Sequence, residues 1–292
     1  MHHLLPYLLF SCYNLNMFTR VYVEITNICN MNCSFCHSHS RKAKTMSEDE
    51  FESILSALKG KTKHLYYHLM GEPLTHPLLP TFIKKANEQG FRSLITTNGT
   101  LIAKKGKELL ESGLYKINLS LHSFEGKDEE YFLHYINDII DFVELAKSTR
   151  TIVVLRLWNK GVDGGLNDKV ISLLHSKIEG EWTENERGIK IRNKLHIEWG
   201  ERFEWPDKDA PLYGDNVFCY GMRDHFGILS DGTVVPCCLD SDGAINLGNV
   251  FKESLDDILN STRAQAIKRG FGSKKAVEDL CKRCGYARRF NV

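Results

Sequence analysis

Before residue 200, apolar residues form short runs that alternate with longer amphipathic segments. The runs are rich in β-branched and aromatic residues, as strands are, and cover residues 21–26, 64–70, 93–97, 116–122, 151–158 and 194–199. Apolar positions recur at helical spacing over residues 46–55, 78–88, 103–111, 130–147 and 165–178. Ser47 and Glu50 supply a capping box for the first of these helices. This alternation predicts a parallel sheet with right-handed crossovers.

The number of strand–helix units limits the choice of fold. Six units in about 180 residues are too few for an eight-unit barrel, which takes ~250 residues. We therefore expect an α/β fold, a partial (β/α)6 TIM-like barrel with its active site at the carboxyl ends of the strands. The rhythm stops after residue 199, where residues 203–216 resemble a linker. A hairpin with Asp231-Gly232 at its turn and a helix over residues 255–268 follow.

We expect three parts in the chain: an optional N-terminal extension (1–16), a core barrel (17–204) and a small C-terminal cysteine-rich hairpin-plus-helix domain (205–292). The apolar stretch in the extension has no basic start and is shorter than the roughly 20 residues that span a bilayer. Lys and Arg number 38 against 37 Asp and Glu, so no overall field attracts nucleic acid or membranes. These features predict a cytoplasmic protein without membrane or nucleic-acid partners.

The nine cysteines add candidate chemistry, because most lie in clusters near the two ends of the chain. Such short spacings favour metal ligands over disulfides. Cys29, Cys33 and Cys36 follow the first strand, and three thiolates on one loop suit a [4Fe–4S] cluster with one open iron. A zinc site completed by His37 or His39 is the alternative. Four further thiols can hold a zinc ion or a second cluster, and they belong to Cys219, Cys237, Cys281 and Cys284.

Short motifs at the predicted strand ends follow the first cysteine loop in a characteristic order. They are Met70-Gly71-Glu72-Pro73, Thr96-Thr97-Asn98-Gly99 and Ser120-Leu121-His122, and Phe35 precedes the last cysteine of the loop. The order resembles the radical S-adenosylmethionine (radical SAM) superfamily, with Met70 in place of a glycine. The resemblance implies a catalytic [4Fe–4S] cluster on Cys29, Cys33 and Cys36. It also implies S-adenosyl-L-methionine on the open iron and a 5′-deoxyadenosyl radical that abstracts a substrate hydrogen.

The resemblance also assigns cofactor-binding residues. Gly71 and Glu72 are expected to accept hydrogen bonds from the methionine ammonium, and Phe35 to lie beside the cofactor. The candidates for the ribose hydroxyls and the methionine carboxylate are Asn98, Ser120 and Arg156. Simpler interpretations stay open, because Asn98-Gly99 also suits a turn, Ser120 a strand-end cap and Arg156 an ordinary ion pair.

The C-terminal cysteines resemble the SPASM/twitch extension of radical SAM enzymes, in which Gly232 stands five residues before Cys237. The resemblance implies a second, auxiliary [4Fe–4S] cluster on the four C-terminal thiols. Cys238 is left over, and its plain interpretation is packing beside that cluster. Because some peptide epimerases of the superfamily carry a similar Cys-Cys pair, Cys238 is also a candidate catalytic hydrogen donor.

The resemblance implies an oxidoreductase-like enzyme that oxidises or otherwise modifies a peptide. A twitch-type dehydrogenase for a small molecule such as a sugar is the alternative. A flavodoxin- or ferredoxin-type electron donor is the expected partner. A non-enzymatic iron–sulfur or zinc binding protein is the rival from another class, but it has no need of the Gly-Glu-Pro and Thr-Asn-Gly strand ends.

Overall fold

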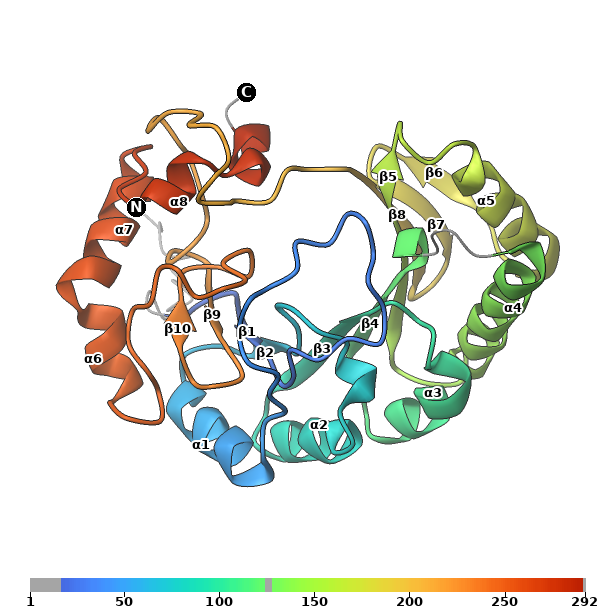
Figure 1. The fold of residues 1–292 in the computed structure, drawn as a ribbon. Coiled ribbons are helices and arrows are strands. Elements are labelled where there is room, and N and C mark those ends of the chain that lie inside the picture. Colours follow the sequence, from blue (N-terminus) through green and yellow to red (C-terminus); the bar gives the residue numbers. More distant parts are fainter. Residues whose placement is uncertain (1–16, 124–127, 291–292) are drawn as a thin grey trace, which may run out of the picture.

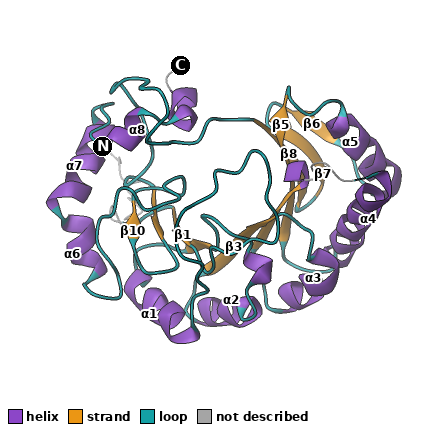
Figure 2. Ribbon diagram, in the orientation of Figure 1, coloured by secondary structure: helices purple, strands orange, loops and turns teal. Residues whose placement is uncertain are grey.

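An open, curved sheet is the centre of the fold in the computed structural model, which describes residues 17–123 and 128–290 (Figure 1). Within these residues the sheet has ten strands in the order β10-β9-β1-β2-β3-β4-β5-β8-β7-β6. The two ends of this order do not pair, so the barrel is incomplete. Helices cover the outer side of the sheet, and loops fill its mouth (Figure 2).

The six predicted parallel strands are confirmed. They are β1 (Arg20–Val23), β2 (His64–Tyr66), β3 (Arg92–Thr97), β4 (Lys116–Ser120), β5 (Ile152–Lys160) and β8 (Leu195–Glu201). The crossover helices are α1 (Glu48–Leu58), α2 (Leu79–Glu88), α3 (Ile102–Glu111), α4 (Glu129–Ala146) and α5 (Leu166–Lys177). Ser47 caps α1 in the predicted capping box with Glu50. The expected α/β partial barrel is therefore the observed fold.

The region around residue 190 differs from the prediction. Strands β6 (Thr183–Asn185) and β7 (Gly188–Arg192) form an antiparallel extension on β8. Gly188 permits the close pairing of β7 with β8, since a Cβ there would lie 1.9 Å from the Ile197 carbonyl oxygen. The sequence pattern does not predict these strands, because β6 has three polar residues and β7 has only two apolar side chains.

The C-terminal segment continues the same sheet. Strand β9 (His225–Ile228) pairs in parallel with β1, and β10 (Val234–Val235) closes the predicted hairpin onto β9. The single helix expected over residues 255–268 is wrong. Two helices, α6 (Leu255–Asn260) and α7 (Thr262–Gly272), meet at Ser261, which adopts extended backbone and caps α7 through the Ala264 amide. A short helix, α8 (Asp279–Lys282), precedes the last cysteine.

The hydrophobic core lies between the sheet and the helices. Val21, Leu65 and Ile117 point outward from their strands and are fully buried there. Phe51 of α1 stacks on Phe82 of α2 with 4.1 Å between ring centroids, which joins these neighbouring helices. The opposite side of the sheet is free to carry polar residues.

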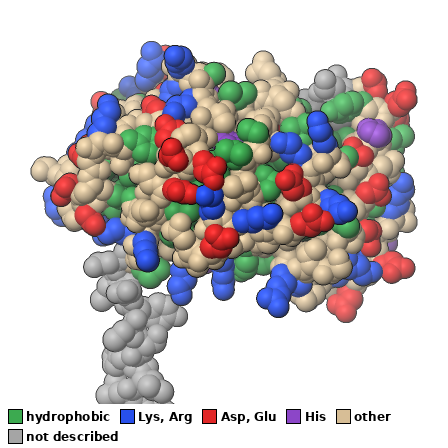
Figure 3. Space-filling model, turned by 90° about the horizontal axis from the view of Figure 1, so that it is seen from below, with side chains coloured by type: hydrophobic (Ala, Val, Ile, Leu, Met, Phe, Trp, Pro, Cys, Tyr) green, Lys and Arg blue, Asp and Glu red, His purple; other side chains and the backbone are tan. Residues whose placement is uncertain are grey.

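Charges of both signs are interspersed on the face drawn in Figure 3. No helix of the described residues is long and apolar enough to span a bilayer. The predicted 1–16 extension lies outside the described residues. The boundary expected between residues 204 and 205 falls in the segment that joins β8 to β9.

Candidate active site

The loop that follows β1 crosses the mouth of the barrel and carries Cys29, Cys33 and Cys36 (Figure 1). Asn27 fixes the base of this loop, because its side chain donates to the Lys42 carbonyl at 2.9 Å and accepts from the Lys44 amide at 2.8 Å. The Met46 amide bonds the Ile25 carbonyl at 2.8 Å on the same base. These bonds bring the two ends of the loop together and hold residues 28–41 above the sheet.

The pKa values of the loop thiols of Cys29 and Cys36 are consistent with ligands of a positively charged cluster core. Partial desolvation raises the pKa of Cys29 and of Cys36, and for Cys36 the nearby Cys29 thiol adds to the rise. Cys33 lies on the same turn, where its carbonyl accepts from the Cys36 amide at 3.1 Å. A bound cation stabilises thiolates and reverses this effect, so the donor set fits an iron–sulfur cluster.

The two histidines of the zinc alternative have other partners. His37 lies 3.4 Å from an Asp207 carboxylate oxygen and stacks on Trp205. His39 contacts the Asn27 carbonyl at 3.0 Å. Within the described residues no three His, Cys, Asp or Glu side chains gather closely enough to hold a single metal ion. These contacts favour the cluster interpretation of the loop.

Gly71 and Glu72 lie directly against the root of the cluster loop. Gly71 has φ +76°, and a Cβ there would lie 2.4 Å from the Thr26 carbonyl oxygen. The Glu72 amide donates to the Ile28 carbonyl at 2.9 Å. Only glycine permits this approach, so the end of β2 and the cluster loop form one unit.

The Glu72 carboxylate has internal hydrogen-bond partners. It is 2% exposed and accepts three internal hydrogen bonds, from the Leu74 amide (2.9 Å), the Thr97 hydroxyl (2.7 Å) and the Asn98 amide (2.7 Å). Burial raises its pKa to about 7, against the lowering by these donors. The carboxylate thus fastens the end of β3 to the end of β2.

Asn98 forms the turn that the sequence suggested and also contacts the cluster loop. Its side-chain oxygen accepts from the Thr100 amide at 3.0 Å, as in an Asx turn, while its Nδ2 donates to the Asn30 side chain at 3.0 Å. The Tyr135 hydroxyl holds the Asn98 carbonyl at 2.8 Å. Asn98 therefore positions the cluster loop over β3.

Phe35, Ser120 and Arg156 line one cavity of about 820 Å³ at the mouth and inside the barrel. Ser120 and Arg156 are neighbours in the pairing of β4 with β5. Arg156 makes the ion pair considered from sequence, with its Nε 3.3 Å from a Glu198 oxygen, and its guanidinium lies 4.6 Å from the Trp158 ring centroid. The three residues share this cavity although they are far apart in sequence.

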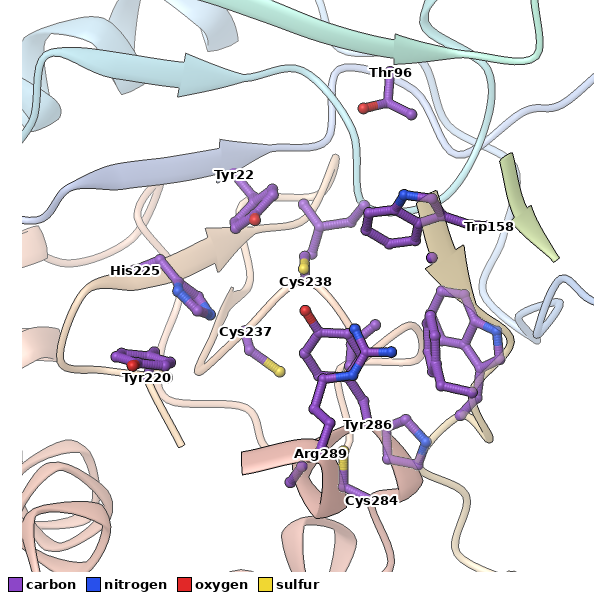
Figure 4. A pocket seen from close by; sticks show the side chains of 18 of the residues that line it. Tyr22, Thr96, Trp158, Tyr220, His225, Cys237, Cys238, Cys284, Tyr286 and Arg289 are labelled. Atoms are coloured by element: carbon purple, nitrogen blue, oxygen red, sulfur yellow. The ribbon is translucent and has the colours of Figure 1, made fainter. Parts of the chain in front are cut away.

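The C-terminal cysteines reach the opposite wall of the same cavity (Figure 4). Burial raises the pKa of the Cys237 thiol well above its usual range, and all the other C-terminal thiols are near enough to raise it further. Burial raises the pKa of Cys284 to about 11. Four half-buried thiols that resist ionisation on their own need a bound cation to become ligands, and this chemistry fits an iron–sulfur cluster. The four are Cys219, Cys237, Cys281 and Cys284.

Cys238 lies between Tyr22 and Tyr286 in Figure 4. Its thiol lies near enough to the Tyr22 hydroxyl for the two to affect each other's pKa, and burial raises the pKa of Cys238 to about 11. It also packs on the small apolar cluster that contains Leu69 and Leu229. Cys238 therefore both packs against apolar side chains and lines the cavity.

Comparison with known proteins identifies the family. The Radical SAM superfamily model matches residues 23–158, and an iron–sulfur cluster-binding domain model, SPASM, matches residues 219–285. The chain belongs to the radical SAM superfamily. The radical SAM match implies a [4Fe–4S] cluster and S-adenosylmethionine, and the SPASM match implies further iron–sulfur binding.

Several radical SAM proteins resemble the chain over most of its length. A probable GTP 3′,8-cyclase of Sulfolobus acidocaldarius is 24% identical over 266 residues, which are 80% of this chain and 85% of the relative. The chain spans about half, 51%, of a GTP 3′,8-cyclase of Chlorobaculum tepidum, which is 31% identical over 56% of this chain. The structure of BtrN in complex with AdoMet and 2-DOIA has TM-score 0.60 at 18% identity, covering 92% and 93% of the two chains. The structure of anSMEcpe with AdoMet and a Cp18Cys peptide has TM-score 0.57 at 16% identity, covering 91% and 88%. These likenesses establish the radical SAM fold.

A buried ion pair that the sequence pattern does not predict lies beside the radical SAM cluster loop. Glu24 is 0% exposed and accepts from Arg41 at 2.7 and 2.6 Å, from the Ser230 hydroxyl at 2.9 Å and from the Met70 amide at 3.2 Å. Arg41 also donates to the Ser241 carbonyl at 2.7 Å. A glutamate within an apolar strand run was the available signal, because an unpaired carboxylate is almost never buried.

Proposed function

We propose that this radical SAM enzyme abstracts a hydrogen atom from a small organic molecule bound in the cavity between the cluster loop and the C-terminal cysteines. One observation carries the proposal: Phe35 of the cluster loop and Cys237 of the C-terminal segment line the same cavity. When bound, the three-cysteine cluster supplies the electron for reductive cleavage of S-adenosylmethionine to methionine and a 5′-deoxyadenosyl radical. The chain's residues hold both reactants and exclude water.

The proposed ligands and binding residues follow the geometry. Cys29, Cys33 and Cys36 hold the catalytic cluster. The Gly71 backbone accepts the methionine ammonium, while Glu72 fixes that segment through its three internal donors. The remaining cofactor contacts come from Phe35, Asn98, Ser120 and Arg156. The auxiliary cluster lies on Cys219, Cys237, Cys281 and Cys284.

The size of the cavity supports a small substrate. Its volume of about 820 Å³ falls within the range of small-molecule sites, roughly 300–1,000 Å³, and S-adenosylmethionine would share this space because its proposed binding residues Phe35, Ser120 and Arg156 line the same cavity. The curated relatives are named for a reaction of GTP, which is also a small molecule. An auxiliary cluster bound at the C-terminal cysteines would accept an electron from a substrate radical, so we favour a net oxidation or a rearrangement.

Modification of a peptide is the second candidate. Two apolar side chains on the cavity lining, Val162 and Tyr220, are 61% and 39% exposed. A peptide that inserts one of its side chains into the cavity would cover Val162 and Tyr220 with its backbone. The anSMEcpe structure, which shares the fold, was solved with a peptide.

Cys238 is the proposed catalytic residue of the auxiliary side. A pKa of about 11 keeps its thiol protonated at neutral pH, which is the form that can give a hydrogen atom. A substrate carbon radical that takes this hydrogen gains a C–H bond and leaves a sulfur radical. One proton and one electron from the flavodoxin- or ferredoxin-type donor restore the thiol.

Anaerobic reconstitution with iron, sulfide, dithionite and S-adenosylmethionine tests the function. We expect 5′-deoxyadenosine in the wild type, at least a hundredfold less in Cys33→Ala, and wild-type amounts without substrate in Cys238→Ala. Liquid chromatography with mass detection measures the product. A fully loaded wild type that forms no 5′-deoxyadenosine would contradict the radical mechanism.

A further inference from the structure

The inner wall of this barrel is polar, whereas parallel barrels ordinarily fill their interior with branched apolar side chains. Arg20, Lys116 and Arg156 line the cavity from β1, β4 and β5. The residues next to them, such as Val21 and Ile117, are 0% exposed in the core beneath the helices. Strand alternation therefore places charge inside the barrel on several strands.

The charges inside the barrel do not balance. Glu198 is the carboxylate that pairs with Arg156, at 3.3 Å, and it is also near enough to act on Lys116. Arg20 and Arg156 both lie near enough to Lys116 to lower its pKa, together with burial. On the strands, these three cations face one carboxylate, whereas the cavity's other charged residues lie outside the strands: Asp163, Asp224, Asp240, Arg202 and Arg289. The strand wall therefore carries a surplus of positive charge in a partly dehydrated space, where it attracts an anion more strongly than in water.

Several buried polar atoms on the cavity lining are also without partners. Among the described residues, Arg20 Nε, His68 Nδ1 and His225 Nδ1 are inaccessible to solvent and make no hydrogen bond. Arg20 and His225 are direct neighbours in the pairing of β1 with β9, and the Tyr22 ring packs edge-on against both histidines. A buried polar group that stays unpaired destabilises the folded protein. The side chains that carry these atoms also line the cavity, so a ligand toward which they turn supplies the missing partners.

We propose that Arg20, Lys116 and His225 form a subsite for an anionic group of the substrate, a phosphate or a carboxylate. This proposal rests on the proposed function, because it identifies the chemical class of the same substrate. Lys116 precedes Ser120 by four residues on β4, which is about 13 Å along a strand. The anionic group is therefore bound deep in the barrel, away from the strand ends where the cofactor residues lie.

Isothermal titration calorimetry tests the subsite. The enzyme is first reconstituted with its clusters and saturated with S-adenosylmethionine, and anions are then titrated into it. The probes are pyrophosphate, as the phosphate source, and succinate, as the carboxylate source. We expect saturable binding of one of them, weakened at least tenfold in Lys116→Met and within threefold of the wild type in Lys116→Arg. Lys107→Met is the matched control, because Lys107 is 78% exposed on α3, and it should leave binding unchanged.

The two arms separate the outcomes. Binding of pyrophosphate alone assigns a phosphate and binding of succinate alone assigns a carboxylate. Saturable binding of neither anion, or equal binding in the wild type and Lys116→Met, overturns the subsite. Formation of 5′-deoxyadenosine is measured on the same samples without substrate. If that product forms while no anion binds, the subsite fails alone; if it is absent, the proposed function fails independently.

Discussion

At the residue scale, Gly71 shows how one missing side chain couples two loops. Its positive φ and its contact with the Thr26 carbonyl both require glycine. The sequence motif identified Gly71 and Glu72 as a pair, yet it did not separate their roles. The structure separates them, since the carboxylate of Glu72 faces inward to Thr97 and Asn98.

The first prediction at this scale compares two glycines with nearly equal backbone angles. Gly60 has φ +77° with open space around it, so Gly60→Ala should cost only the roughly 1–2 kcal/mol of the left-handed conformation. Gly71→Ala must also displace the Thr26 backbone. We expect a larger loss of stability in urea unfolding and at least tenfold less 5′-deoxyadenosine. Equal losses in the two variants would show that the Thr26 contact is unimportant.

At the scale of elements, the Glu24–Arg41 pair joins β1, the cluster loop and the C-terminal hairpin. Ser40 adds to this contact, because its amide and hydroxyl both donate to Asp242, at 2.7 and 3.0 Å. The hairpin also pairs with β1 through β9. The catalytic loop and the auxiliary segment are therefore held to the same strand.

Glu24→Gln should destabilise the protein by about 3–5 kcal/mol, because it leaves the Arg41 guanidinium buried without its counter-charge. Urea unfolding measures the change, and hydrogen exchange should rise in residues 230–242. Glu24→Gln combined with Arg41→Met should recover part of the loss. Glu111→Gln, which breaks the exposed pair with Lys107, is the control and should have no measurable effect. Unchanged unfolding of Glu24→Gln would refute the role of the pair.

Sequence periodicity predicted the larger elements well and the smaller ones poorly. The apolar stripe of α4 and the run of β5 are long enough to fix both type and place. Strand β6 is exposed throughout, so it has no apolar pattern to detect. The sequence does not show that the helix is interrupted at Ser261, because serine occurs both within helices and at their N-caps. The extended backbone of Ser261 in the structure shows that one helix ends there and the next begins.

At the scale of the whole molecule, one cavity joins Phe35 of the cluster loop to the C-terminal cysteines, about two hundred residues away in sequence. Cys281→Ser should remove about four of roughly eight iron atoms per chain while 5′-deoxyadenosine still forms. Cys33→Ser should remove the other four and abolish that product. Metal analysis of purified, reconstituted protein measures both. One zinc and about four irons per chain in the wild type would contradict an auxiliary iron–sulfur cluster.

The sequence by itself determined the alternation of strands and helices, the cysteine spacings and the radical SAM motifs, since all are local patterns of residue type. Tertiary structure alone decided which side chains meet: Glu72 with Thr97, Glu24 with Arg41, and Cys238 with Tyr22. The charge inside the barrel was written in the sequence as alternating residues on β1 and β4. It became a candidate binding site only because sheet curvature turns Arg20, Lys116 and His225 toward one space. Distances across a sheet depend on register and curvature, which no local pattern records.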